Sequence, residues 1–359
     1  MTTRERMLAV YEHKIPDRFP VGIYGRYLPR GEIERKLRDK GLGIITYHPL
    51  VTFLGPPWHD LPGYISDVRN TSVREDRYFE SGRMVRRITY ETPVGSVWSE
   101  KEPSVGDGSE HTRSYFIKSV EDYKIMTYIV EHTVISSNER AISLRLAELG
   151  EDGVLLGRLD RSPYQKLLLE FVGGERFLVD IFEETEAVEE LMDAMYLRLE
   201  ESYEQALSTE ALLVWQPDNV TSDMTPPRYF EKYLLPYYKK LSAAVHASGK
   251  KLAAHFDGKV KAISDLIPRS GVDVLDSLSL PEIGGDMTLT EARRAFSGVS
   301  VFPNFPANLS PADEKDIRAF LRVLKAEAGT DEPFMLQISE DLQEGSWARV
   351  LPIIADEML

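Results

Sequence analysis

The chain has 359 residues, a formal net charge of -15, no cysteine and 42% hydrophobic residues. The acidic balance argues against nucleic acid or an anionic membrane surface as a partner, and the lack of cysteine excludes disulfides, thiol nucleophiles, cysteine-bound zinc and iron-sulfur clusters. Any metal must therefore be held by histidine, carboxylate or water. No apolar run approaches the roughly 20 residues of a membrane helix, and the first residues predict a charged helix rather than a signal peptide, so we expect a cytoplasmic protein.

Short apolar runs alternate with helical patterns along most of the chain. We predict strands at 19–24, 43–47, 153–157, 211–215, 251–255, 272–276, 300–303 and 333–338. After an N-terminal helix with a Thr2/Glu5 capping box, helices are predicted at 32–39, 119–135, 138–149, 186–207, 227–247, 288–296, 311–328 and 346–358. About eight strand-helix units at this length predict an α/β fold, a closed (β/α)8 TIM barrel. An open doubly wound sheet is the alternative, but the glycine-rich phosphate turn that it should carry is missing from the sequence.

One segment breaks this alternation. At about 66–118, after the second strand, polar and apolar residues alternate, with turn signals at Ser81-Gly82 and Pro93-Val94-Gly95. This pattern predicts a small antiparallel insertion. We find no linker or internal repeat, so a single barrel domain spanning 1–359 is the simpler prediction.

Polar residues stand at the predicted C-terminal strand ends, where barrels of this type place their active sites. Those we interpret as substrate-binding are Tyr24, Arg26, His48, Arg158 and Asp276, and those we interpret as catalytic are Asp218, His255, Asp257 and Glu340.

The stretch Lys251–Gly258 contains the central pair of these candidates. Side chains alternate along a strand, so His255 and Asp257 lie on one side and Phe256 on the other. With Glu340 they make a nitrogen and oxygen donor set that suits Zn, Mn or Fe(II). A hydrogen-bonded network without a metal is the alternative.

Several stretches together resemble the uroporphyrinogen decarboxylase superfamily. They are Thr-Arg-Glu-Arg-Met-Leu-Ala-Val at 3–10, Pro-Asp-Arg-Phe-Pro-Val at 16–21, Gly-Arg-Tyr-Leu-Pro at 25–29, Thr-Pro-Val-Gly at 92–95, Gly-Lys-Lys-Leu-Ala-Ala-His at 249–255 and Gln-Ile-Ser-Glu-Asp-Leu at 337–342. The resemblance covers essentially the whole chain and implies a (β/α)8 barrel. It also implies one of two activities, decarboxylation of a tetrapyrrole without a cofactor or methyl transfer with a corrinoid protein.

The decarboxylase motifs are only partly kept. Of the paired arginines before Tyr-Leu-Pro, the second is Arg26 and the first falls on Gly22. The family's pyrrole-binding aspartate falls near His48, its tyrosine on Leu169 and its final-strand histidine on Glu340.

The methyltransferase motif keeps a donor at every ligand position. That branch holds zinc with a His-x-Cys pair and a later cysteine, and the matching positions here are His255, Asp257 and Glu340. Two carboxylates in place of two thiolates give a harder ligand set in the Lewis acid–base sense. Such a set suits zinc or another divalent metal that acts as a Lewis acid and polarises a methoxy or similar leaving group. The resemblance therefore implies methyl transfer between a small substrate and a corrinoid on a partner protein, with Asp218 and Arg158 positioning the substrate.

Two other functions stay open. One is a decarboxylase acting on uroporphyrinogen or a smaller carboxylic acid through Arg26 and Asp218, and the other is a non-catalytic protein that binds a tetrapyrrole or corrinoid. Family members often form dimers, so the resemblance also implies a homodimer.

Overall fold

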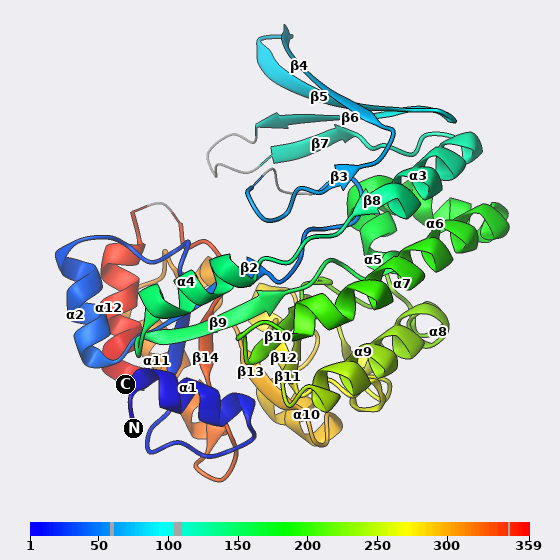
Figure 1. Cartoon of the computed structure of the whole chain (residues 1–359). Coiled ribbons are helices and arrows are strands. Elements are labelled where there is room, and N and C mark those ends of the chain that lie inside the picture. Colours follow the sequence, from blue (N-terminus) through cyan, green and yellow to red (C-terminus); the bar gives the residue numbers. More distant parts are fainter. Residues whose placement is uncertain (58–60, 104–109, 344) are drawn as a thin grey trace. The chain divides into compact units, whose positions relative to one another are not determined.

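Eight parallel strands form one sheet in the computed structural model, in the order β13-β12-β11-β10-β9-β2-β1-β14 (Figure 1). Asn304, just after β13, forms a parallel bridge with Gln337 of β14, and the Phe305 amide donates to the Gln337 carbonyl at 2.7 Å. The sheet therefore closes into the predicted (β/α)8 barrel. Its strands are β1 (Val21–Tyr24), β2 (Gly43–Pro49), β9 (Gly153–Arg158), β10 (Leu213–Gln216), β11 (Lys251–Ala254), β12 (Val274–Leu278), β13 (Ser300–Pro303) and β14 (Leu336–Ile338).

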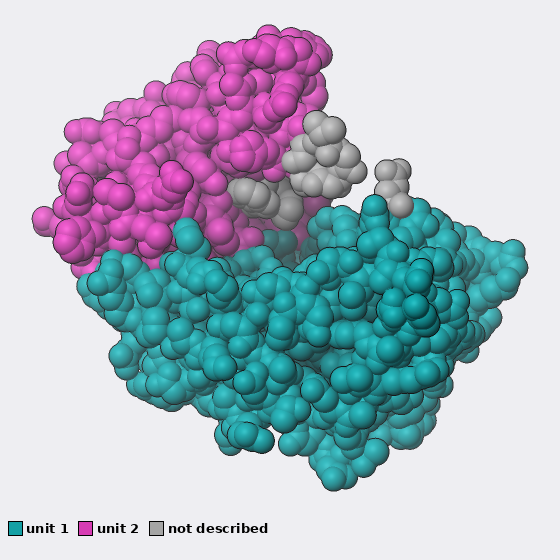
Figure 2. Space-filling model, turned by 180° about the vertical axis from the view of Figure 1, so that it is seen from behind, with its two compact units in different colours: residues 1–50, 139–159, 207–359 teal, residues 51–138, 160–206 magenta. Residues whose placement is uncertain are grey.

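The structure describes residues 1–57, 61–103, 110–343 and 345–359. They divide into two units, shown in separate colours in Figure 2. The first unit consists of residues 1–50, 139–159 and 207–359 and holds all eight barrel strands, and the second consists of residues 51–138 and 160–206. The organisation as a single domain stays a prediction.

Helices of the first unit surround the barrel strands and close one end. Their bounds are α1 (Thr3–Tyr11), α2 (Glu32–Lys40), α4 (Glu139–Leu149), α8 (Pro227–Tyr229), α9 (Leu235–Ala247), α10 (Leu289–Ala295), α11 (Glu314–Ala328) and α12 (Trp347–Met358). A π-helical turn at Phe230–Leu234 joins α8 to α9. Met7, Val10 and Tyr11 of α1 pack into the buried cluster that the strands enclose, so α1 fills the N-terminal end of the barrel and leaves the carboxyl end for a site.

Glycines make room for α1 inside the barrel. A Cβ atom on Gly43 would lie 2.3 Å from the Met7 sulfur, and one on Gly22 would lie 2.7 Å from a carbon of Ile45. Neither distance is possible without displacing the neighbour. A larger side chain at Gly22 or Gly43 would therefore require Ile45 or Met7 to move.

The second unit contains the antiparallel sheet predicted after the second strand. Its strands are β4 (Ser72–Glu80), β5 (Arg83–Thr92), β6 (Gly95–Pro103) and β7 (Glu110–Ser114), and a separate short pair is β3 (Asp67–Val68) with β8 (Thr133–Val134). The helices of this unit are α3 (Val120–His132), α5 (Pro163–Lys166), α6 (Gly174–Glu183) and α7 (Thr185–Leu207), with a π-helical turn at Leu167–Phe171 after α5.

Most predicted elements lie within a few residues of the observed ones. The sequence did not predict α5 and α6, because Pro163, the π-helical turn and Gly173 interrupt the helical pattern of this stretch. Within the described part of the chain, no helix combines the length and the apolar character needed to span a bilayer.

Candidate active site

Four aromatic side chains gather at the carboxyl end of the barrel. Tyr24, Tyr47 and Trp215 come from β1, β2 and β10, and Tyr27 follows β1. Ring centroids are 5.9 Å apart for Tyr24 and Tyr47 and 5.4 Å apart for Tyr47 and Trp215. Tyr27 lies parallel to Tyr24, with centroids 6.5 Å apart. We call these four residues the aromatic cluster; their rings form an apolar surface next to the polar strand ends.

Two arginines border the aromatic cluster. The guanidinium carbon of Arg158, at the end of β9, lies 5.9 Å from the Tyr47 ring centroid and 5.7 Å from that of Trp215. The guanidinium carbon of Arg26 lies 4.7 Å from the Tyr27 ring, and its Nη2 lies 3.9 Å from a carboxylate oxygen of Asp341. Arg158 is buried and Arg26 is half exposed, so the two cations sit at different depths.

His255 follows β11 and lies against the aromatic cluster, with its ring centroid 5.8 Å from that of Trp215. Its Nδ1 lies 2.6 Å from the backbone carbonyl of Asp276. A carbonyl only accepts hydrogen bonds, so Nδ1 carries the proton and the neutral ring keeps its lone pair on Nε2. Nε2 lies 4.0 Å from a carboxylate oxygen of Asp257. The ring can therefore accept a proton or bind an electrophile through Nε2.

The segment that follows β12 also positions Asp257. The Ser279 hydroxyl donates to the Asp257 carboxylate at 2.6 Å and accepts from the Gly258 amide at 3.0 Å. The Asp257 side chain is 42% exposed, and this hydrogen bond orients its carboxylate. Ser279 thus holds both the carboxylate and the backbone of its loop.

Replacing Ser279 by alanine should lower the free energy of unfolding by about 1 kcal/mol, since one hydroxyl serves both partners. Urea denaturation measures this loss. The matched control is Ser248→Ala, an exposed serine whose hydroxyl donates to the carbonyl of Val245, where we expect a change below about 0.5 kcal/mol. Equal losses in the two variants would show that Ser279 does not organise the Asp257 loop.

Glu340 follows β14 and is half-buried. Burial raises its pKa, the charge of Asp257 raises it further, and Asn304 and His255 oppose the rise. Asn304 also accepts from the Ser339 amide at 3.0 Å, which fixes the chain just before Glu340. The carboxyl group of Glu340 therefore lies within electrostatic reach of both His255 and Asp257.

The three predicted metal ligands share one end of the barrel, but they do not form a metal cage as they lie. Among the residues that the structure describes, no three His, Asp or Glu side chains are arranged to hold a metal ion. The side chains of His255, Asp257 and Glu340 thus do not fit a zinc ion in this arrangement. Zinc binding stays a prediction.

Asp276 of β12, whose backbone carbonyl contacts His255, has a fully buried side chain. Burial raises its pKa to about 6, while His255, Gln337 and Tyr24 oppose the rise. Gln337 and Tyr24 are close enough for this electrostatic effect, yet no described residue makes a hydrogen bond of normal geometry to either carboxylate oxygen. A buried carboxyl group with a raised pKa next to an imidazole is typical of functional sites.

Comparison with known proteins places the chain in a family. The family model described as uroporphyrinogen decarboxylase (URO-D) matches residues 124–337, more than half of the chain. The chain belongs to the URO-D family. Among solved structures, a methyltransferase from Methanosarcina mazei is similar over 99% of both chains, with a TM-score of 0.58 and 13% sequence identity. This likeness shows a shared fold, and none of the curated proteins compared with the chain matches it.

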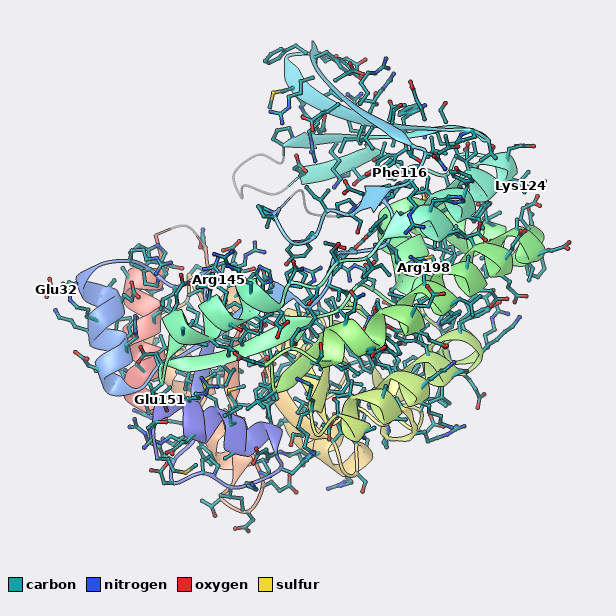
Figure 3. All side chains as sticks on the ribbon, in the orientation of Figure 1. Glu32, Phe116, Lys124, Arg145, Glu151 and Arg198 are labelled. Carbon is teal, nitrogen blue, oxygen red and sulfur yellow. The ribbon has the colours of Figure 1, made fainter. Side chains whose placement is uncertain are left out.

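The structure of this URO-D family member places two predicted site residues elsewhere. Asp218 is fully buried, accepts from Gln216 at 2.8 Å and from Tyr238 at 2.7 Å, and so ties the end of β10 to α9. His48 lies on the opposite face of β2 from Tyr47. Burial lowers the pKa of His48, and the charge of Arg145 on α4, labelled in Figure 3, lowers it further. Neither residue joins the aromatic cluster.

Two residues of the site were missed by the sequence reasoning. Tyr47 and Trp215 stand immediately before the polar residues His48 and Gln216, which drew attention because they are polar. The signal that finds them is strand alternation, because Ile45 of the buried barrel interior predicts that Tyr47 also points inward.

Proposed function

We propose that this URO-D family member transfers a methyl group between a small substrate and a corrinoid carried by a partner protein. The observation that carries the proposal is His255 at the barrel mouth, with Nδ1 committed to the Asp276 carbonyl and Nε2 directed to the side of Asp257 and Glu340. Family membership and the fold shared with a methyltransferase support it.

Methyl transfer from oxygen or nitrogen needs a proton at the donor atom. The bond from the methyl carbon to that atom breaks, its electron pair stays on the donor atom, and a proton neutralises the charge. A reduced corrinoid supplies the electron pair of the new bond to carbon. The residues of this chain supply the proton, and Glu340, whose pKa is raised, and the imidazole of His255 are placed to hold it.

The variant His255→Asn tests this role. The asparagine amide can still donate near the position of Nδ1, but the Nε2 group is lost, so we expect normal folding and a rate lowered by about 10²–10⁴-fold. The assay is anaerobic conversion of free cob(I)alamin to methylcobalamin, followed by absorbance, with methanol, methylamines and methoxybenzoates as donors. Exposed His111 on β7 provides the control His111→Asn, which should keep the wild-type rate.

Absence of methyl transfer from every donor by the wild-type protein contradicts the proposal. The metal content of the purified wild-type protein and of Glu340→Ala is measured beside the assay. If Glu340 is a zinc ligand, the wild-type protein should contain stoichiometric zinc and the variant should lose it.

Decarboxylation is the second candidate, and the half-exposed guanidinium of Arg26 at the barrel mouth favours it because it can bind a substrate carboxylate. Gly22, which stands at the position of the family's first arginine, opposes it because that guanidinium group is missing here. Incubation with uroporphyrinogen, followed by product analysis, tests it. Loss of carboxyl groups supports decarboxylation, and binding of the ring without turnover supports a non-catalytic role.

A further inference from the structure

We propose that strand β4 is a self-association surface, on which a second copy of this chain pairs its own β4 in the antiparallel direction. The two four-stranded sheets would then join into one continuous sheet. This inference concerns the second unit alone and does not depend on the proposed methyl transfer.

One side of β4 is an open sheet edge. In the described part of the chain the sheet order is β4-β5-β6-β7, so β4 lies at one margin of the sheet (Figure 1). It has nine residues, most of them exposed. A long exposed edge strand offers backbone donors and acceptors to another chain. The other margin, β7, has five residues and a register shift in its pairing with β6, two features that discourage such pairing.

The hairpin turn fixes which backbone groups of β4 face the open edge. Ser81 and Gly82 have positive φ angles of 51° and 77°, and Glu80 pairs with Arg83 across them, so the turn has two residues. The residues that flank such a turn bond to each other, and the bonding residues alternate along the strand. The even-numbered residues of β4 therefore bond to β5, and the odd-numbered residues from 73 to 79 present their backbone groups to the open edge.

One register brings complementary side chains together. It places Asp76 of the two copies opposite each other on a twofold axis. Val73, which is 55% exposed, then meets Phe79, which is 78% exposed. Glu75 meets Arg77 on the same face, and symmetry repeats both contacts. The dimer therefore gains two apolar pairs and two pairs of opposite charge across the new strand boundary.

The neighbouring registers lack this match. A register centred on Glu75 pairs Val73 with Arg77, and one centred on Arg77 pairs Phe79 with Glu75. Both lose the apolar pairs and place two like charges on the axis, which is destabilising for residues directly opposite each other. The side chains of β4 therefore select the register centred on Asp76.

The charges of β4 tolerate a second copy. Asp76 meets its symmetry mate in this register, but Arg74 Nε lies 3.0 Å from its carboxylate and Arg87 stands opposite it on β5. The chain as a whole carries a net charge of -15, so most surfaces of two copies repel each other. The central run Arg74-Glu75-Asp76-Arg77 has two charges of each sign, and β4 escapes that repulsion.

The chain contains no cysteine, so introduced thiols test the register directly. In Asp76→Cys the two thiols occupy an opposed pair outside the backbone bonding, where Cα atoms are about 4.5 Å apart and a disulfide fits. We expect mild oxidation to convert most of this variant into a covalent dimer on a non-reducing gel. The matched control is Arg74→Cys, because the two copies of residue 74 lie about 13 Å apart along the strands and should not cross-link. Equal cross-linking of both variants, or none in Asp76→Cys, overturns the proposal.

Sedimentation velocity with exchanged charges tests the interface without a covalent bond. We expect the wild-type protein to form dimers at about 100 μM or below, as small interfaces do. Arg77→Glu opposes acidic side chains and should weaken the dimer at least about tenfold, and the double variant Glu75→Arg/Arg77→Glu should restore it. The control Lys124→Glu makes the same charge change on exposed α3 of the same unit and should dimerise like wild type (Figure 3).

Three outcomes of this experiment contradict the proposal. They are a wild-type protein that stays monomeric, assemblies larger than a dimer, and a dimer that Arg77→Glu leaves unchanged. Larger assemblies are not expected, because two copies that use the same edge close the contact between them.

Discussion

The variant Asp276→Asn is expected to raise the free energy of unfolding at pH 7 by up to about 3 kcal/mol relative to wild type. Asp276 is fully buried, and burial raises its pKa from 3.8 to about 6. The folded protein therefore holds this proton more tightly than the unfolded chain does. Wild-type stability falls as the pH rises through about 4 to 6, and an amide that does not titrate removes that loss.

Urea denaturation of both proteins between pH 4 and pH 7.5 checks this expectation. The gain should be small near pH 4, where the folded wild type is already protonated, and should level off above about pH 6. Exposed Asp265 offers the control Asp265→Asn, which should follow the wild-type curve. A constant difference between Asp276→Asn and wild type at every pH contradicts a titrating buried carboxyl group.

The variant Asp276→Asn also tests whether the carboxyl group of Asp276 contributes to activity. The backbone carbonyl of residue 276 still accepts from His255 in Asp276→Asn, so the orientation of the imidazole is kept. A buried carboxyl group whose ionisation destabilises the fold is typical of a group retained for function rather than for stability. We therefore expect the stabilised variant to be less active in the methyl-transfer assay.

The largest expected loss of stability is for Lys166→Met in the second unit. Lys166 is fully buried, and its ammonium group donates to the two Asp160 oxygens at 2.7 and 2.8 Å and lies 3.3 Å from Glu170. Burial raises the pKa of Asp160, and the charge of Lys166 opposes that rise. Removing the cation leaves buried carboxylates without it, which should cost about 3–5 kcal/mol.

A double variant separates the charge from the packing. In Asp160→Asn/Lys166→Met the carboxylate charge on residue 160 is also gone, so part of the loss should be recovered. The control Lys36→Met breaks an exposed pair with Glu32, both side chains being more than 70% exposed, and should cost below about 0.5 kcal/mol. Urea denaturation measures all three. A loss for Lys166→Met no larger than for Lys36→Met would show that the buried cluster adds no stability.

Local patterns were sufficient to predict the barrel. Runs such as Leu252-Ala253-Ala254 are apolar because a parallel barrel strand is buried on both faces, and the closing Gly258 has a φ of 92°, which glycine adopts without strain. The predicted pair of His255 and Asp257 is likewise a local feature, since strand alternation needs only neighbouring residues. Nε2 and the carboxylate do lie 4.0 Å apart.

The second unit was beyond such reasoning. It joins residues 51–138 with residues 160–206, so two stretches separated by α4 and the barrel strand β9 make one packed body. Asp160 of the second stretch accepts from the Leu54 amide of the first stretch at 2.8 Å, which links the two stretches. Its carboxylate also accepts from Lys166 at 2.7 Å. No spacing in the sequence reveals which distant segment will supply the buried partner of a charge.

The amino-acid sequence by itself determined the order of strands and helices, the antiparallel insertion and the imidazole at the end of the fifth barrel strand, because each depends on periodicity over a few residues. Only the tertiary structure decided which polar strand ends share a site. It tied Asp218 to α9 and buried Asp276 beside His255. The physical reason is that a side chain's direction and its loss of water depend on neighbours brought from elsewhere in the chain.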